Sequence, residues 1–225
     1  RFGGIQQTEY PPEFLFFISV TTLKRIEHMS RTIYLFLMLI INSQLLADFV
    51  KPADIEIIAS NLLFTEGPAC DQQGNLYFSD LKERRIYKIS TDGKKSIFLD
   101  IKLRTNGLMF HRNGLLYACV THPDAKRKIG SLISINPKNK KITTIASTYN
   151  GNAFNRLNDL VIDKSGGVYF TDIIPGKKDR GQKKAGIYYC SAKGKVTKLA
   201  DSDNKPNGIL LSVDETVLYV VMSAD

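Results

Sequence analysis

The sequence predicts an all-β fold, a β-propeller of which about three and a half blades lie within residues 48–225. A polar pair recurs four times, and each pair is followed at a nearly fixed distance by a turn and a short apolar strand that carries a tyrosine. The tyrosines are separated by 40, 52 and 50 residues. Repeats of this length, with several short strands in each unit, are typical of propeller blades. The pairs are Glu66-Gly67, Asn106-Gly107, Asn158-Asp159 and Asn207-Gly208, and the tyrosines are Tyr77, Tyr117, Tyr169 and Tyr219.

The first unit contains four predicted strands. An inner strand begins at Gly67, and a turn over residues 71–75 leads into an apolar strand at residues 76–80. Residues 85–89 alternate polar and apolar side chains, as a half-buried strand does. After a second turn, residues 96–99 form the fourth strand. Asp and Gly in these turns tolerate the left-handed backbone conformations that hairpins need.

The later units repeat this scheme. The second unit has predicted strands at residues 131–135 and 141–145, and the third has them at residues 186–190 and 195–199. The fourth unit reaches only the strand at residues 218–221. We therefore expect the chain to be a fragment that lacks C-terminal blades. We also expect it to be inactive by itself, because an open propeller leaves sheet edges unpaired.

Residues 29–47 have the pattern of a bacterial signal peptide. Met29 opens a short basic segment, and residues 33–41 are nine apolar residues in a row. A helix that crosses a bilayer needs about 20 apolar residues, so no stable membrane insertion is expected after the peptide is removed. Ala47 is the predicted cleavage point, although Leu45 stands where a small residue is usual. The mature protein, beginning at residue 48, is therefore expected in the periplasm or outside the cell.

Residues 1–28 show neither a repeat nor a clear period, and they mix aromatic with polar groups. We interpret them as an upstream segment that is either foreign to the native protein or disordered. The alternative interpretation is an N-terminal membrane anchor built from both apolar patches. Charged residues between the patches, including Lys24, Arg25 and Glu27, oppose it because charges are costly in a membrane-spanning helix.

The chain has a net charge of +9, which comes mostly from lysines in predicted turns. The densest basic run is residues 176–184, between two strands of the third unit. This run is either an ordinary solvated loop or a segment that steers an anionic substrate towards the channel. It lacks interleaved aromatic residues, which bases stack on, so no nucleic-acid partner is expected.

The three cysteines, Cys70, Cys119 and Cys190, fall in or beside apolar strands. They form no CxxC motif and show no spacing typical of a zinc site. We therefore expect small buried apolar side chains at all three positions, and neither a redox function nor a zinc site.

The four polar pairs stand where inner strands begin, and inner strands line the central channel of a propeller. Glu66, Asn106, Asn158 and Asn207 are therefore expected to face this channel together. A carboxylate with amide oxygens suits a hard divalent cation such as Ca²⁺. Asn-Gly and Asn-Asp also occur in ordinary turns, so each pair alone allows a purely structural interpretation. Four such pairs at equivalent positions of successive units favour a binding site over a purely structural role.

At these residues the sequence resembles the gluconolactonase family, also called the senescence marker protein/gluconolactonase/luciferin-regenerating enzyme-like group. The resemblance covers residues 55–225. It implies a six-bladed propeller with one catalytic divalent cation, usually Ca²⁺, in the channel, and hydrolysis of a lactone. The motifs that carry it are Thr65-Glu66-Gly67-Pro68, Asn155-Arg156-Leu157-Asn158-Asp159-Leu160, Tyr169-Phe170-Thr171-Asp172 and Lys205-Pro206-Asn207-Gly208-Ile209.

The resemblance also implies roles for individual residues. Glu66, Asn158 and Asn207 match three cation ligands. The fourth ligand, an Asp that also serves as general base, would lie in a blade beyond residue 225, so no catalytic base is assigned. Arg156 matches a substrate contact, with a structural salt bridge as the alternative. Three further suggestions concern the channel: Asn106 contacts substrate or supports a ligand, His122 contacts substrate near the channel mouth, and Asp159 orients Asn158 by a hydrogen bond.

The expected function is therefore metal-dependent opening of a sugar lactone or a similar small cyclic ester. The absence of a GxSxG motif argues against a serine-nucleophile hydrolase. Two alternatives stay open: a non-catalytic propeller that binds a ligand or a protein, and a related metal-dependent hydrolase of organophosphates or other esters. Glu66 favours an enzyme, because a pure scaffold does not need a carboxylate among channel amides. The sequence leaves the oligomeric state open.

Overall fold

The computed structural model describes residues 56–123, 130–173 and 182–223, and the chain divides into two units, Arg1–Glu56 and Ile57–Asp225. The described residues belong to the second unit, apart from Glu56. The predicted upstream segment (1–28), the predicted signal peptide (29–47) and most of the basic run at 176–184 lie outside them. Within the described ranges, no helix has the length and apolar character needed to cross a membrane.

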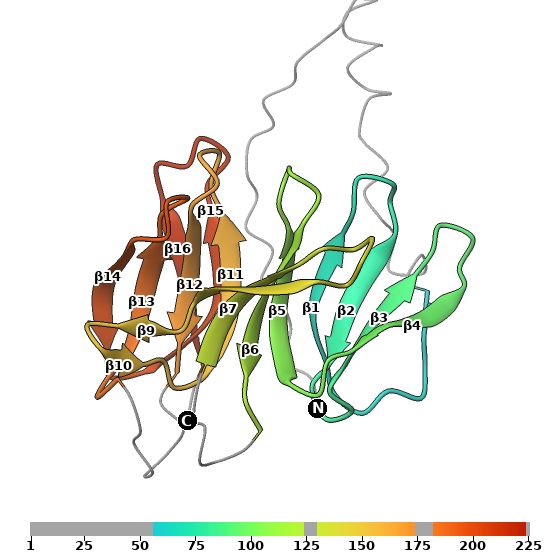
Figure 1. Ribbon diagram of the computed structural model, residues 1–225, viewed down its shortest axis with the longest axis horizontal. Coiled ribbons are helices and arrows are strands. Elements are labelled where there is room, and N and C mark those ends of the chain that lie inside the picture. The colour runs from blue at the N-terminus through green and yellow to red at the C-terminus, as the bar shows by residue number, and fades with distance from the viewer. Residues whose placement is uncertain (1–55, 124–129, 174–181, 224–225) are drawn as a thin grey trace, which may run out of the picture. The chain divides into compact units, whose positions relative to one another are not determined.

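The second unit contains three antiparallel sheets of four strands, each connected in simple up-and-down order (Figure 1). The first sheet comprises β1 (Thr65–Cys70), β2 (Leu76–Asp80), β3 (Arg85–Ile89) and β4 (Lys95–Asp100). The second comprises β5 (Arg104–Phe110), β6 (Leu116–Thr121), β7 (Gly130–Ile135) and β8 (Ile142–Ala146). The third comprises β11 (Leu157–Ile162), β12 (Val168–Asp172), β13 (Ala185–Cys190) and β14 (Val196–Ser202).

A two-stranded sheet follows the third, with β15 (Lys205–Leu211) paired to β16 (Leu218–Ser223). The inner strands β1, β5, β11 and β15 pack against one another in this order. The prediction of an all-β propeller with about three and a half blades is therefore confirmed. One element was not predicted: a small hairpin, β9 (Thr148–Tyr149) with β10 (Asn152–Ala153), lies between the second and third blades.

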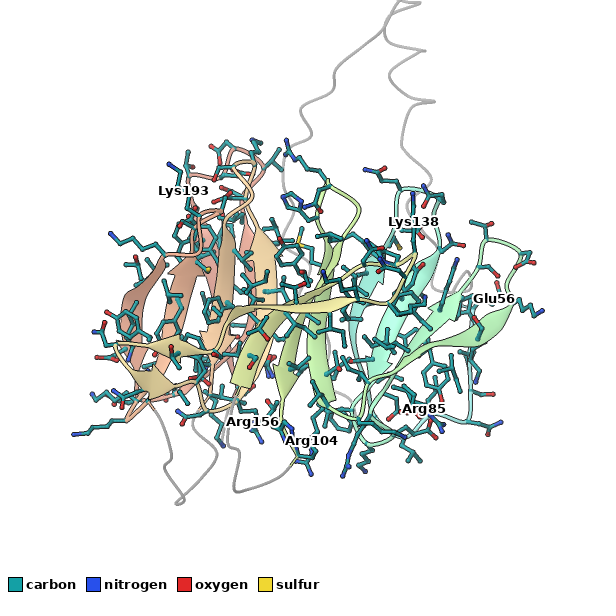
Figure 2. The ribbon with its side chains drawn as sticks, in the orientation of Figure 1. Glu56, Arg85, Arg104, Lys138, Arg156 and Lys193 are labelled. Carbon is teal, nitrogen blue, oxygen red and sulfur yellow. The ribbon has the colours of Figure 1, made fainter. Side chains whose placement is uncertain are left out.

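Apolar side chains fill the space between neighbouring blades (Figure 2). Between the first two blades, Tyr77 of β2 packs edge-on against Phe98 and Phe110, with ring centroids 4.9 Å apart in both pairs. Between the second and third blades, Phe154 contacts Phe170 and Tyr188 in the same way. Each interface uses residues from two sheets, so the blades fix the relative positions of their inner strands.

The three cysteines are free. Cys119 and Cys190 are buried, as predicted, whereas the prediction for Cys70 is wrong because its side chain is exposed. Cys70 is the last residue of β1 and lines a cavity along the inner strands, so no neighbouring sheet covers it.

Every inner strand has a register irregularity near its polar pair. Two residues of the inner strand oppose a single residue of the second strand between Glu66 and Ala69, Thr105 and Leu108, Leu157 and Leu160, and Pro206 and Ile209. Such bulges redirect side chains and often adjoin functional sites. Three of the four polar pairs occupy these bulges. In β1 the bulge is one residue later, at Gly67-Pro68, and Glu66 still pairs with Ser79.

Candidate functional site

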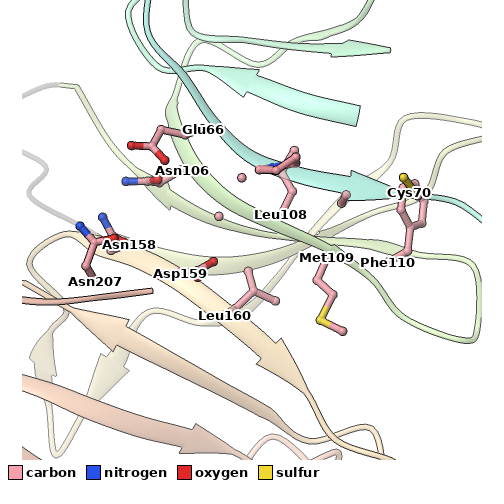
Figure 3. A pocket seen from close by; sticks show the side chains of 14 residues that line it. Glu66, Cys70, Asn106, Leu108, Met109, Phe110, Asn158, Asp159, Leu160 and Asn207 are labelled. Atoms are coloured by element: carbon pink, nitrogen blue, oxygen red, sulfur yellow. The ribbon is translucent and has the colours of Figure 1, made fainter. Parts of the chain in front are cut away.

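The polar pairs meet in one cavity of about 490 Å³ along the inner strands. Glu66 of β1, Asn106 of β5, Asn158 of β11 and Asn207 of β15 all line it, together with Asp159 (Figure 3). The four side chains come from four different blades, and packing of the inner strands places them at a common level. The structure thus brings together the residues that the sequence placed at the channel.

Two of the amides are presented in a way that suits oxygen coordination. The Nδ2 group of Asn207 donates a hydrogen bond to Ser223 Oγ at 2.8 Å, which leaves its Oδ1 atom for another partner. The side chain of Asn158 is only 6% exposed, yet its amide has no hydrogen bond to any described residue. Because Asn158 lines the cavity, its amide is available to a ligand there.

The cavity also contains two carboxylates whose ionised forms are disfavoured. Burial, and then the negative charge of Asp159, raise the pKa of Glu66. Burial also raises the pKa of Asp159, although the backbone N–H groups of Leu160 and Ile209 oppose this. A divalent cation bound in the cavity would favour the ionised forms of both carboxylates.

The donor set fits a hard cation that binds oxygen. The described residues contain no group of three His, Cys, Asp or Glu side chains that could hold a metal. The candidate site consists instead of carboxylate and amide oxygens, which are the ligands of Ca²⁺ rather than of zinc. Glu66, Asn158 and Asn207 therefore remain the predicted ligands.

Asp159 was predicted to orient Asn158 by a hydrogen bond, but the structure gives it a different partner. Its Oδ2 atom accepts a hydrogen bond from the backbone N–H of Ile209 at 3.1 Å, so it links β11 to the next blade. No hydrogen bond joins it to the side chain of Asn158 among the residues described. A methyl group on Gly107 would overlap the Asp159 carboxylate, so glycine at this position allows Asp159 to lie between the blades.

Hydroxyl groups of the second strands hold the inner strands at the level of the cavity. Ser79 Oγ lies 3.1 Å from the carbonyl oxygens of both Glu66 and Asn106, which share its single proton. The equivalent Thr171 Oγ1 donates to the carbonyl of Asn207 at 2.8 Å and accepts from the N–H of Asp159 at 3.1 Å. In each case one hydroxyl connects a site residue of its own blade with one of the next blade. Cys119 occupies this position in β6.

We expect Thr171→Val in the full-length protein to lower both stability and cation affinity. The substitution keeps the shape of the side chain but leaves the carbonyl of Asn207 and the N–H of Asp159 without their partner, which costs about 1–3 kcal/mol. Loss of a group that positions a ligand typically weakens metal binding by about ten-fold. Chemical denaturation and calorimetric Ca²⁺ titration measure the two effects. Thr171→Ser should restore both, and undiminished affinity in the Val variant would show that the hydroxyl is merely structural.

An aspartate after each of these hydroxyls fixes the entry into an inner strand. Asp172 is fully buried and accepts hydrogen bonds from the backbone N–H groups of Asn155 and Arg156, the latter at 2.7 Å. Burial raises the pKa of Asp172 to about 6. Asp80 accepts in the same way from Leu63 N at 2.7 Å. Sequence reasoning missed this role, although the repeated dipeptides Ser79-Asp80 and Thr171-Asp172 were its signal.

The predicted substrate contacts lie at different places. Asn106 lines the cavity beside Glu66 (Figure 3). Arg156 directly precedes β11 and does not line the cavity. Among the described residues no carboxylate forms an ion pair with it, and its contact with substrate stays a prediction. His122 directly follows β6, whose last residue, Thr121, pairs with Arg104 at the start of β5. His122 thus lies at the end of the blade where the inner strands begin.

Comparison with known proteins agrees with this geometry. Residues 64–225 match the family model for the SMP-30/gluconolactonase/LRE-like region. The chain is 31% identical to a gluconolactonase of Zymomonas mobilis, over 74% of its own length and 51% of that protein. It is 30% identical to lactonase drp35 of Staphylococcus epidermidis, over 72% of its length and 49% of that protein. The chain thus spans about half the length of these curated relatives.

Solved structures show the same relationship. A gluconolactonase of Xanthomonas campestris superposes with a TM-score of 0.64 at 26% identity, over 72% of this chain and 56% of that one. Regucalcin of Agrobacterium tumefaciens, a calcium-binding protein, superposes with a TM-score of 0.55 at 25% identity, over 73% and 52%. These neighbours are six-bladed propellers. The chain therefore belongs to the SMP-30/gluconolactonase/LRE-like family.

Proposed function

We propose that the full-length protein is a hydrolase that opens a sugar lactone or a similar small cyclic ester with the help of a divalent cation, Ca²⁺. One observation carries the proposal: a carboxylate and three amides from four successive blades line a single cavity. The names of the relatives, gluconolactonase and lactonase, support the reaction class. The name of the regucalcin neighbour, a calcium-binding protein, supports the cation.

In this proposal Glu66, Asn158 and Asn207 hold the cation. The bound cation would polarise the lactone carbonyl or the attacking water. Asn106 lies beside Glu66 and offers an amide to a substrate hydroxyl or carbonyl. Arg156 and His122 are proposed substrate contacts nearer the mouth. The proposed base and fourth ligand is an Asp in the part of the protein beyond residue 225, and it takes the proton of the water.

The proposal also includes export of the protein. Export to the periplasm or out of the cell rests on residues 29–47 alone, and the N-terminal sequence of the mature protein tests it. A non-catalytic binding propeller would share the channel, but it has no need for the carboxylates of Glu66 and Asp159 among the amides of the cavity. Fold alone does not select among these functions, so the substrate requires an assay.

The test is hydrolysis of D-gluconolactone by the full-length protein with and without EDTA. We expect chelation to reduce the rate by at least about 100-fold, because the cation supplies most of the charge stabilisation, and added Ca²⁺ to restore it. Spontaneous lactone hydrolysis is the background control. A thermal melt provides a second measurement, since a ligand that binds only the folded state raises the melting temperature. Full activity after thorough chelation would rule out the cation-dependent mechanism.

A further inference from the structure

The inner strands carry a second repeated feature, a basic residue two positions before each channel asparagine. Arg104 precedes Asn106, Arg156 precedes Asn158, and Lys205 precedes Asn207. The corresponding residue of the first blade is Phe64. Arg104 and Lys205 are the first residues of β5 and β15, and Arg156 stands directly before β11. Because β5, β11 and β15 pack in order, the three basic residues stand at one end of adjacent strands.

The two arginines lie near each other at this end. Figure 2 shows Arg104 and Arg156 beside one another at the lower edge of the sheets. The two arginines also lie close enough for the positive charge of Arg104 to act on Arg156, and the negative charge of Asp172 acts on Arg156 as well. Like charges in proximity cost free energy unless an anion compensates them.

No described carboxylate forms an ion pair with either arginine. The ion pairs among the described residues are Arg85–Glu83, Lys102–Asp100, Lys184–Asp203 and Lys198–Asp201, so none includes Arg104 or Arg156. Asp172, whose negative charge acts on Arg156, accepts hydrogen bonds from the backbone N–H groups of Asn155 and Arg156. Glu66 and Asp159 lie in the cavity, where they balance the proposed cation. Among the described residues, the two arginines therefore have no ion-pair partner at the end where β5 and β11 begin.

We propose that Arg104 and Arg156 form an anion clamp, and that the preferred substrate is a lactone that carries an anionic group remote from its ring carbonyl. This inference rests on the proposed lactonase function. The planar guanidinium group pairs with carboxylate or phosphate through two parallel hydrogen bonds, so both anions suit the clamp. Lys205 occupies the same register on the next blade and adds a third positive charge to this end. A lactone held there by its anion can extend inwards towards Glu66 and the amides.

The first experiment compares three lactones with the full-length protein. D-Gluconolactone is neutral, D-glucaro-1,4-lactone carries a carboxylate, and 6-phosphogluconolactone carries a phosphate. We expect kcat/KM for at least one anionic lactone to exceed that of the neutral lactone by about ten-fold or more. Added salt should reduce this advantage, because screening weakens the attraction between exposed charges. The better of the two anionic lactones identifies the anion.

The second experiment uses variants. Arg104→Gln should lower the ratio of kcat/KM for the anionic over the neutral lactone by about ten-fold, through KM rather than kcat. Arg104→Lys keeps the charge but loses the planar fork, so it should retain part of the preference. Arg112→Gln is the matched control, because Arg112 is exposed in the turn between β5 and β6 at the opposite end of the same hairpin. Thermal melts confirm that each variant folds.

The outcomes separate this inference from the proposed function. Hydrolysis of all three lactones at similar kcat/KM, unchanged by Arg104→Gln, would overturn the clamp and leave the lactonase function standing. If no lactone is hydrolysed, the proposed function fails. Calorimetric binding of glucarate and 6-phosphogluconate then decides on the clamp alone: affinity that Arg104→Gln reduces about ten-fold supports it, and no measurable binding overturns it.

Discussion

The Glu66→Gln variant of the full-length protein is expected to bind Ca²⁺ at least about 100-fold more weakly than the unaltered protein. Glutamine has the same shape and keeps an oxygen at the same place, so the change removes one negative charge and little else. Ca²⁺ sites depend strongly on the charge of their ligands, and Glu66 is the one carboxylate among the predicted ligands within this chain. Calorimetric titration measures the affinity, and lactone hydrolysis should fall with it.

The same Glu66→Gln substitution should leave the cation-free protein equally stable or more stable. Burial and the charge of Asp159 raise the pKa of Glu66, so the folded state holds this proton more tightly than the unfolded state. The ionised carboxylate therefore destabilises the cation-free protein as pH rises through the raised pKa. The Gln variant lacks this penalty and should melt at an equal or higher temperature at neutral pH. Glu56→Gln is the control, because Glu56 is exposed. Unchanged Ca²⁺ affinity in the Glu66→Gln variant would exclude Glu66 as a ligand.

Phe154→Ala is expected to reduce the free energy of unfolding by about 3–5 kcal/mol. Phe154 is fully buried, and its ring centroid lies 5.2 Å from that of Phe170 and 5.0 Å from that of Tyr188. Its backbone also joins the blades, since Gly130 N donates to its carbonyl at 3.0 Å. Truncation leaves a cavity between the second and third blades that rigid strands cannot close.

Denaturation with urea measures this loss. Phe64→Ala is the matched control, because Phe64 is 49% exposed and its removal should change stability by no more than about 1 kcal/mol. A loss of less than about 1 kcal/mol in the Phe154 variant would mean that the segment between β10 and β11 is not part of the core. Cation affinity should weaken as well, because Phe154 lies four residues before Asn158.

The strands and the set of channel residues could be predicted from the sequence because both follow the repeat. A fixed period places Glu66, Asn106 and Asn158 at equivalent points without knowledge of any contact. The bulges could not be predicted, since they depend on how each inner strand pairs with its neighbour. The hydrogen bond from Ile209 to Asp159 joins different blades, so no local pattern indicates it.

Other features had signals that the sequence reasoning did not use. The hairpin of β9 and β10 turns at Asn150-Gly151, where both residues have positive φ angles of 48° and 77°. Asn-Gly is a strong hairpin signal, but the flanking strands are two residues each and contain little apolar alternation. The exposed Cys70 had no such signal, because its exposure depends on which inner-strand faces the next blade leaves uncovered.

The bulges have a consequence for how such a site can change. Asn106, Asn158 and Asn207 each occupy the stretch of an inner strand where two residues share one opposing residue. Their side chains line the cavity, and Leu108, two residues after Asn106, is buried in the core between the first two blades. Exchanging one of these amides for a carboxylate or a hydroxyl would alter the chemistry of the channel while the scaffold stays intact. The same propeller can thus be adapted to a new cation or a new substrate one blade at a time.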